Sequence, residues 1–446
     1  MHLDLKQTNR YPAVPDQIGR MYRYMSEIAV PPSPAADIPW EQQFATRASG
    51  MVASEIRELL KILARPDIVS FAGGIPDPAL FPSEAFAEAY RSVFADPSRT
   101  AAALQYSISE GHRPLRDWIV AHMAGQGVAC SADHVLITSG SQQALDFLGK
   151  LMLSPGDTVL ATTPTYLGAL QAFSAYEPHY QRLHPEGGNQ TPDHYLAQAA
   201  RHGGRPKLLY VVPDFANPTG ETLSEAARLR LLDLAEETGA LVVEDAAYRQ
   251  LRYEGLPVPS VLALDCGRRG GIERARSVYC GTFSKTLAPG LRMGWIAGPR
   301  PLIEKLVLIK QAADLHSGTL DQVVLGDVAQ QCLEDRLPLL CGTYRRRRGA
   351  MLAALEASAP AGTTWTRPQG GLFVWVTLPE QVDTRALLPR AVEEARVAYV
   401  PGGAFFFDGR GGNTLRLSFS LADEATIDRG IRSLMALVGE FVRGHG

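Results

Sequence analysis

The chain has 446 residues, of which 46% are hydrophobic and 20% are charged. This composition is typical of a folded protein with a sizeable core and excludes a largely disordered chain. The net charge of −3 provides no overall basic field that would attract nucleic acid. No apolar run approaches the roughly 20 residues that a membrane-spanning helix needs.

The cysteines and the N-terminus indicate where the protein works. Five scattered cysteines include no CxxC pair, which argues against zinc-knuckle and thioredoxin-like sites. An odd, scattered count is typical of reduced thiols in the cytosol. Charged residues without an apolar stretch between them begin the chain, which argues against a secretory signal. We therefore expect a cytoplasmic protein with no metal site.

Residues 1 to about 40 are the least regular part of the sequence. Pro31, Pro32, Pro34 and Pro39 cannot continue a helix or a central strand. We interpret this part as an extension that lies on the surface or over an opening, with a partly disordered tail as the alternative. From Ser54 onward, apolar residues at helical spacing predict a helix.

The middle of the chain alternates between short apolar strands and helices. Strands are predicted at 134–138, 158–161, 207–212, 240–244, 277–280 and 293–297. Helices are predicted between several of them, for example at 142–153 and 223–238. This alternation favours an α/β fold with a mostly parallel sheet between helices, and such sheets bind ligands at the carboxyl ends of their strands.

The last 120 or so residues change character. Helices around 302–313 and 344–357 precede strands at 372–378, 398–400 and 414–419, which predicts a separate α+β unit. Four consecutive arginines, 345–348, lie inside the second helix. Because consecutive helical residues point around the whole cylinder, we interpret this run as a solvated helix surface with some ion pairing. A nucleic-acid or targeting patch is the alternative.

The segment 281–295 carries the most specific signal. It follows an apolar strand and surrounds Lys285 with Ser, Thr and Gly, and Arg292 follows on the same segment. A lysine on a constrained turn can form a Schiff base with a carbonyl cofactor, and hydroxyls beside an arginine suit a phosphate. A surface lysine in a loop is the alternative.

Three other segments add to this signal. The sequence 138–143 joins a strand to a helix, whose N-terminus is a potential anion site, although this segment alone favours an ordinary serine cap. Asn217-Pro218-Thr219-Gly220 follows the strand at 207–212. A third apolar strand ends in Glu244 and Asp245, where a buried anion needs a cationic partner.

Taken in order, these segments resemble the fold-type I pyridoxal-phosphate aminotransferases of class I/II. Within that class the chain looks closest to the multisubstrate branch that contains the α-aminoadipate and kynurenine aminotransferases. The resemblance runs from about Ser54 to the C-terminus and includes SFAGGIPDPALFP (70–82), LQYSISEGHRPLR (104–116), TSGSQQALD (138–146), TFSKTLAPGLRMGW (282–295) and LRLSFS (415–420).

The resemblance implies a cofactor, pyridoxal 5′-phosphate, and the residues that hold it. Lys285 would form the Schiff base, and Asp245 would pair with the pyridinium nitrogen so that the ring can act as an electron sink. Asn217 and Tyr248 would hydrogen-bond the phenolic oxygen, and Asn217–Pro218 would be a cis peptide. The ring face and the phosphate would be contacted by Tyr166, Ser141, Gln142, Thr282, Ser284 and Arg292.

The resemblance also implies substrate contacts and a homodimer. Arg416 would bind the α-carboxylate bidentately, and Asn217 would also contact the substrate. Gly74 would line the substrate site, and Arg57 matches a mobile arginine that can meet a side-chain carboxylate. Tyr106 matches a position that reaches the phosphate of the partner subunit, so the two active sites would be shared across the interface.

The implied fold is a large domain with a mostly parallel seven-stranded sheet between helices, plus a smaller α+β domain. Its boundaries would be an N-terminal extension (1–50), an N-terminal segment of the small domain (51–90), the large cofactor-binding domain (91–325) and the small C-terminal domain (326–446). The chain departs from the branch at Ala246 and Ala247, where an acid and a proline are usual, and at Phe405–Phe407, where a tyrosine is expected. Its N-terminal extension is also longer than usual. These departures leave the choice of substrate open.

The expected activity is transfer of an amino group from an L-amino acid to a 2-oxo acid, with 2-oxoglutarate as acceptor, by a ping-pong mechanism. Lys285 would move the proton as general base and then as general acid. A β-lyase, decarboxylase or racemase on the same fold is the nearest alternative. A regulator that senses pyridoxal phosphate is a second one, although no helix-turn-helix pattern precedes the domain. Amino donors are expected to be aminoadipate, aromatic or branched-chain amino acids.

Overall fold

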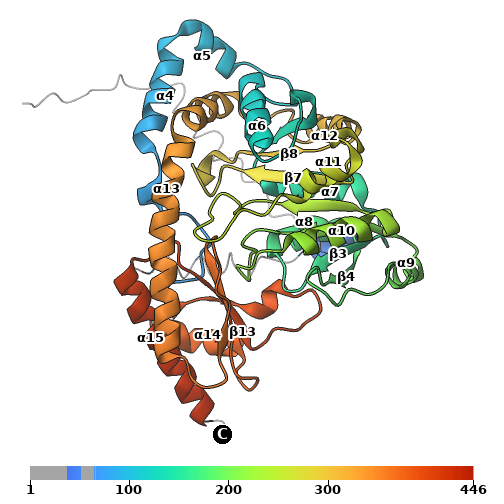
Figure 1. Cartoon of the computed structure of the whole chain (residues 1–446). Helices are drawn as coiled ribbons and strands as arrows, with labels where there is room; N and C mark the ends of the chain where they lie inside the picture. The colour runs from blue at the N-terminus through green and yellow to red at the C-terminus, as the bar shows by residue number, and fades with distance from the viewer. Residues whose placement is uncertain (1–37, 52–64, 66, 445–446) are drawn as a thin grey trace, which may run out of the picture. The chain divides into compact units, whose positions relative to one another are not determined.

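The computed structural model describes residues 38–51, 65 and 67–444 (Figure 1). The chain separates into two units, residues 1–49 and 50–446, and each is described by itself. In the first unit, the short helix α2 (Trp40–Gln43) has no buried side chain. The expectations for residues 1–37, for the helix that begins near Ser54 and for Arg57 lie outside the described residues.

Among the described residues, the second unit is built around a seven-stranded sheet in the order β2-β8-β7-β6-β5-β3-β4. Strand β8 runs antiparallel to both of its neighbours, and the other pairs are parallel. The mostly parallel sheet expected from the sequence is therefore confirmed. Its strands are β2 (Val135–Thr138), β3 (Thr158–Thr162), β4 (His179–Leu183), β5 (Pro206–Val211), β6 (Leu241–Asp245), β7 (Ser277–Thr282) and β8 (Gly294–Ala297).

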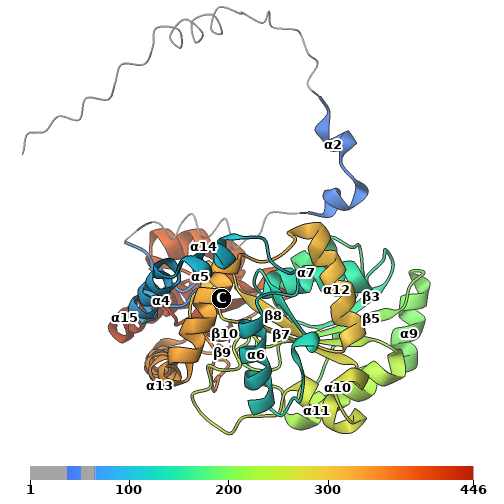
Figure 2. The same cartoon turned by 90° about the horizontal axis from the view of Figure 1, so that it is seen from above.

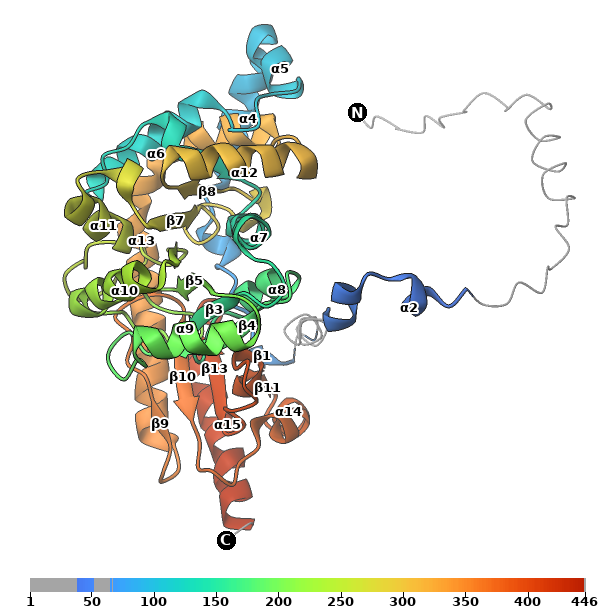
Figure 3. The ribbon, with the colours of Figure 1, turned by 90° about the vertical axis from the view of Figure 1, so that its right-hand side faces the viewer.

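Helices cover both faces of this sheet (Figures 2 and 3). Successive strand residues point to opposite faces, so Val243 belongs to the core cluster that includes α7, α8 and α12, while its neighbour Val242 belongs to the one that includes α9, α10 and α11. Helix α6 covers the second face near β2. The helices are α6 (Arg113–Gly125), α7 (Ser141–Met152), α8 (Leu167–Ser174), α9 (Pro192–Arg201), α10 (Glu225–Thr238), α11 (Val261–Arg269) and α12 (Arg300–Ala313).

A smaller α+β part follows, and it belongs to the same unit, residues 50–446, as the large sheet. Its antiparallel sheet has the order β12-β13-β10-β9, and a separate parallel pair joins β1 (Val69–Ser70) to β11 (Val397–Ala398). The β1 strand therefore brings an early segment of the chain beside the C-terminal one. The other elements are β9 (Thr364–Trp365), β10 (Phe373–Thr377), β12 (Val400–Pro401), β13 (Thr414–Ser418), α14 (Thr384–Glu393) and α15 (Glu424–Gly444).

Helix α13 (Thr319–Ser358) corrects one sequence prediction. The predicted helix at 344–357 is only its last part, because the 40-residue helix begins at Thr319 and continues through Pro338. Its first half packs against α4 (Ser83–Ala95), α5 (Pro97–Leu104) and α6, and its second half lies along α15 (Figure 1). The proposed domain boundary at 325/326 falls within this helix.

Two smaller predictions are also wrong. The predicted strand 398–400 is divided at Tyr399, because β11 pairs with β1 while β12 pairs with β13. The arginine run is not uniformly solvated: Arg345 and Arg346 are exposed, but the helix turns the next two inward. Arg347 pairs with Asp77 at 2.6 Å, and Arg348 donates to the Pro368 carbonyl at 2.6 Å.

No helix in the described ranges has both the length and the apolar character required to cross a bilayer.

Candidate active site

Asp245 is the last residue of β6, and its side chain is buried. The Tyr210 hydroxyl donates to Asp245 Oδ2 at 2.9 Å, and Oδ1 has no hydrogen-bond partner among the described residues. Burial raises the pKa of this carboxyl to about 6, since an anion loses its hydration there. An unpaired buried oxygen of this kind is suited to a cationic N–H partner.

Lys285 lies on the turn that follows β7, and its ammonium contacts the early segment of the chain that contains Gly74. Lys285 Nζ donates to the Gly74 carbonyl at 3.2 Å. Burial lowers the lysine pKa to about 8, and the guanidinium groups of Arg416 and Arg292 add to the effect. A lysine with a lowered pKa supplies more free amine near neutral pH, which is the nucleophilic form.

A cradle for an anion forms where α7 begins. Gly140 precedes the helix with φ +82°, and a Cβ added to it would lie 2.6 Å from Arg292 Nη2. A Cβ at Gly294 would lie 2.8 Å from the Ser141 nitrogen. The start of α7 and the Arg292 guanidinium therefore lie close together, and a helix N-terminus beside an arginine suits a phosphate.

Two hydroxyls belong to the same turn as Lys285. Thr282 Oγ1 donates to Ser284 Oγ at 2.9 Å and accepts from the Ser284 N–H at 3.1 Å. Both residues are buried. The turn is thus fixed by its own hydrogen bonds, with hydroxyl groups beside the lysine.

Tyr166 and Gln142 contact one another. The Tyr166 hydroxyl donates to Gln142 Oε1 at 3.3 Å, and Gln142 Nε2 donates to the Gly168 carbonyl at 2.6 Å. Burial, reinforced by Asp245, raises the pKa of Tyr166 to about 12, so its ring stays neutral. The Gln142 side chain is therefore engaged with Tyr166 and Gly168.

Arg416 on β13 connects Asn217 to the small sheet. Arg416 Nη1 donates to Asn217 Oδ1 at 2.8 Å, and Nη2 donates to the Ala72 carbonyl at 2.6 Å. Asn217 Nδ2 in turn donates to the Tyr248 hydroxyl at 3.5 Å. Asn217–Pro218 is a cis peptide, as expected. Burial lowers the pKa of Arg416 to about 10, and its Nε has no hydrogen-bond partner among the described residues.

Gly74 is required by close packing, because a Cβ there would lie 2.5 Å from the Phe373 ring. Tyr106 stands apart from the other predicted residues: its side chain is 80% exposed and its ring meets the His316 ring edge-on at 6.0 Å. The structure thus brings together every described candidate except Tyr106.

Sequence reasoning missed several neighbours of these residues. Tyr210 could have been found from the sequence. It pairs with Val243 of β6, and alternate residues of a strand share one face, so Tyr210, Val243 and Asp245 point to the same side of the sheet. Two aromatic rings lie close to the Arg416 guanidinium, Phe373 at 4.3 Å and Phe405 at 5.1 Å. Phe405 belongs to the stretch that departs from the branch, whereas Phe373 left no local signal.

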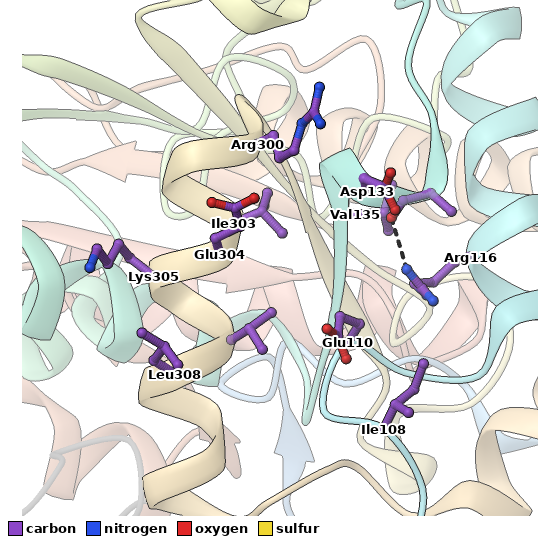
Figure 4. Close-up of a pocket in the computed structure, with 12 residues that line it drawn as sticks. Ile108, Glu110, Arg116, Asp133, Val135, Arg300, Ile303, Glu304, Lys305 and Leu308 are labelled. Atoms are coloured by element: carbon purple, nitrogen blue, oxygen red, sulfur yellow. Dashed lines mark hydrogen bonds between the residues drawn. The ribbon is translucent and has the colours of Figure 1, made fainter.

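A separate pocket of about 650 Å³ lies between β2 and α12 (Figure 4). Its lining mixes acidic and basic side chains with Ile108 and Leu308 and contains none of the predicted site residues. Among the residues that the structure describes, no group of three His, Cys, Asp or Glu side chains could hold a metal ion.

The donor set fits pyridoxal phosphate. The unpaired Asp245 oxygen suits a pyridinium N–H, and the Gly140–Arg292 cradle suits a phosphate. Lys285, with its lowered pKa, suits the cofactor's aldehyde.

Comparisons with known proteins agree with this geometry. Residues 67–434 match the family described as aminotransferase class I and II. The chain is 42% identical to an aromatic-amino-acid aminotransferase of Thermococcus litoralis, over 91% of this chain and 96% of the relative. It is also 42% identical to a 2-aminoadipate transaminase of Thermus thermophilus, over 89% and 96%. A solved structure of the α-aminoadipate aminotransferase of Thermus thermophilus, complexed with N-(5′-phosphopyridoxyl)-L-leucine, superposes with a TM-score of 0.80 at 39% identity. That match covers 91% of this chain and all of the other.

Proposed function

Because the chain belongs to the class I and II aminotransferases and is a pyridoxal-phosphate-dependent transaminase, we propose that it moves the amino group of an L-amino acid to 2-oxoglutarate in two half-reactions at Lys285. The family and its relatives favour amino transfer over the β-lyase, decarboxylase, racemase and regulator alternatives. The observation that supports the residue assignment most strongly is the buried Asp245 oxygen that has no hydrogen-bond partner among the described residues.

In this proposal the chain holds the cofactor at three points. Asp245 accepts from the ring nitrogen, and its pairing with that cation keeps the carboxylate ionised despite burial. Arg292 and the N–H groups at the start of α7 bind the phosphate, while Tyr166 packs on the ring. When bound, pyridoxal phosphate supplies an electron sink for the carbanion that forms at the substrate Cα.

Arg416 positions the substrate. Its guanidinium presents parallel N–H donors to a carboxylate, and the Phe373 and Phe405 rings exclude water from it. The negative charge of a bound α-carboxylate would compensate the positive charge of the Arg416 guanidinium, which burial disfavours.

Lys285 performs the proton transfer. Once released as a free amine, Nζ takes a proton from the substrate Cα and returns it on the cofactor side, so one group serves as base and then as acid. Its lowered pKa places the amine close to the balance between both forms that this exchange needs.

The proposed donors are aromatic amino acids, aminoadipate and branched-chain amino acids. Support comes from the relatives, which are named for aromatic amino acids and 2-aminoadipate, and from the aromatic rings around Arg416. Arg57, proposed to meet a side-chain carboxylate, lies outside the described residues.

We further propose a homodimer with shared sites. Exposed apolar side chains gather around Tyr106: Leu104 is 65% and Ile108 is 52% exposed, and Leu308 lines the same pocket as Ile108 (Figure 4). Exposed apolar patches of this kind mark interaction surfaces. A cytosolic location is the accompanying proposal, and it accords with five cysteines that are all free thiols.

The test follows the cofactor's absorption in each half-reaction. Purified holoenzyme mixed with a single amino donor should lose its lysine-bound absorption, and added 2-oxoglutarate should restore it. A panel of aromatic, aminoadipate, branched-chain and acidic donors then ranks kcat/KM. If the amino donor releases ammonia and no 2-oxo acid restores the lysine-bound absorption, the result would contradict amino transfer and favour a lyase.

A further inference from the structure

A buried aspartate on the turn after β5, Asp214, binds three arginines. Arg228 binds Asp214 with both terminal nitrogens, at 2.9 and 3.2 Å, Arg249 Nη1 lies 2.7 Å from Oδ2, and Arg252 Nη2 lies 3.0 Å from Oδ1. The Asp214 and Arg228 side chains are fully buried. We call these four residues the Asp214 cluster.

The cluster ties together the two turns that lead into the active site. Asp214 belongs to the turn after β5 that continues to Asn217, and Arg249 directly follows Tyr248 on the turn after β6. Arg228, from α10, also donates to the Pro213 carbonyl at 3.0 Å. One carboxylate therefore fixes the spacing between the backbone segments that carry Asn217 and Tyr248.

The turn that carries Asn217 needs such support. Phe215 has φ +54°, a left-handed conformation that is strained for a bulky side chain and persists only where its surroundings fix it. The Arg252 guanidinium lies 4.7 Å from the centre of the Phe215 ring. Across the ring, a Cβ at Gly370 would approach Phe215 to 2.5 Å. Packing and the ion cluster together hold this turn in place.

We propose that the Asp214 cluster is a positioning device that aims the Asn217 amide and the Tyr248 hydroxyl at the phenolic oxygen of the cofactor. The inference rests on the roles proposed above for Asn217 and Tyr248. Hydrogen-bond donors at that oxygen favour its ionised form and so lower the pKa of the lysine-bound cofactor. Displacing either turn removes donors and raises that pKa.

The other charged groups that face this site remain in the variants below. Arg416, Arg292 and Asp245 act on Lys285, and the Tyr166 hydroxyl is close to Asp245 and Arg416. Arg249 is the best residue to change, because Asp214 keeps Arg228 and Arg252 as partners when it is removed.

The experiment is a pH titration of the visible absorption of the holoenzyme. In Arg249→Met we expect the midpoint to rise by about one pH unit, the size of one lost hydrogen bond to a charged group. The matched control is Arg269→Met, which also removes an arginine from a buried aspartate. Asp265 keeps the Arg276 N–H and the Ser277 hydroxyl as partners there, far from both turns in the sequence. The control should keep the wild-type midpoint.

A second variant keeps the test available if Arg249→Met does not fold. Arg249→Lys keeps the charge but cannot bind Asp214, Gln126 and Val258 together, so its midpoint should also rise. Wild-type midpoints in both Arg249 variants would overturn the positioning role of the Asp214 cluster and leave the proposed function untouched. A wild-type holoenzyme without any titrating visible absorption would instead contradict the attachment of the cofactor at Lys285.

Discussion

Arg228 and Arg416 are both buried almost completely, and their surroundings differ in one respect. Arg228 binds Asp214 with two hydrogen bonds and fills its remaining donors with backbone carbonyls. Arg416 contacts an amide oxygen, one carbonyl and two aromatic rings, and within the described ranges no carboxylate pairs with it. A buried guanidinium without a counter-charge opposes folding but suits an incoming anion.

The lysines repeat the contrast. Lys310 is fully buried, yet its ammonium binds both Asp314 oxygens at 3.0 Å, as well as Gln143 and Ser317. Lys285 contacts one backbone carbonyl. The fold thus satisfies the charges that hold its parts together and leaves open those that are aimed at ligands.

The largest expected effect follows from removing Lys285. Lys285→Ala should lower kcat by at least about 10³-fold, because the proton transfer loses its base. Lys310→Met, the matched control, should lower stability and leave most of the turnover. Steady-state kinetics of both variants gives the answer, and near-normal kcat in Lys285→Ala would remove this residue from the mechanism.

Arg416 should rank next. Losing one partner of a buried charge pair costs about 2–5 kcal/mol, so we expect Arg416→Met to lower kcat/KM by about 10²- to 10³-fold. Its melting temperature should change less than that of an Asp214 variant, because removal of a buried charge without a carboxylate partner offsets the loss of the donor to Asn217 and Ala72. A variant that loses stability and keeps kcat/KM would reverse the comparison with Arg228.

Asp214 should show the opposite pattern. Asp214→Ala leaves three guanidinium groups without their shared carboxylate, so the free energy of unfolding should fall by about 3–5 kcal/mol. Denaturant unfolding monitored by circular dichroism measures this loss. An unchanged midpoint would mean that the arginines find other partners, and the cluster would then not be structural.

The pH dependence of stability in acid also tests the role of the Asp214 carboxyl, without removing the side chain. The arginines hold the pKa of Asp214 below its ordinary 3.8, despite the opposing effect of burial. A lowered folded-state pKa contributes stability above the unfolded value, and this contribution is lost as pH falls through the folded value. We expect wild-type stability to decline below about pH 4, with a shallower decline in Asp214→Asn; parallel curves would contradict this assignment.

Tyr106→Phe should have the smallest effect. Only the exposed hydroxyl is removed, so cofactor retention should weaken by about tenfold or less, the value of one hydrogen bond. Light scattering should find the dimer intact, with activity measured at the same dilution. A fully active monomer would contradict the shared sites.

Sequence alone predicted most of the sheet and the candidate residues, because each predicted strand and each motif is a local pattern. Asp245 ends one strand and Lys285 follows another, and the apolar character of both strands is visible in the sequence. The prediction of helix α13 was too short because a proline such as Pro338 disfavours a helix interior, although this helix continues through it. Its two halves also pack in different core clusters, so no single apolar stripe marks the whole helix. The Asp214 cluster was invisible, because its ion pairs join three segments that only the fold brings together.

Mapping the cofactor's attachment tests the central claim most directly. Borohydride reduction of the holoenzyme makes the lysine linkage permanent, and peptide mass spectrometry then locates it. We predict a phosphopyridoxyl group on Lys285 and none on Lys310, the buried lysine whose charge is already paired. A modification at any other lysine, or no modification at Lys285, would contradict this account of the site.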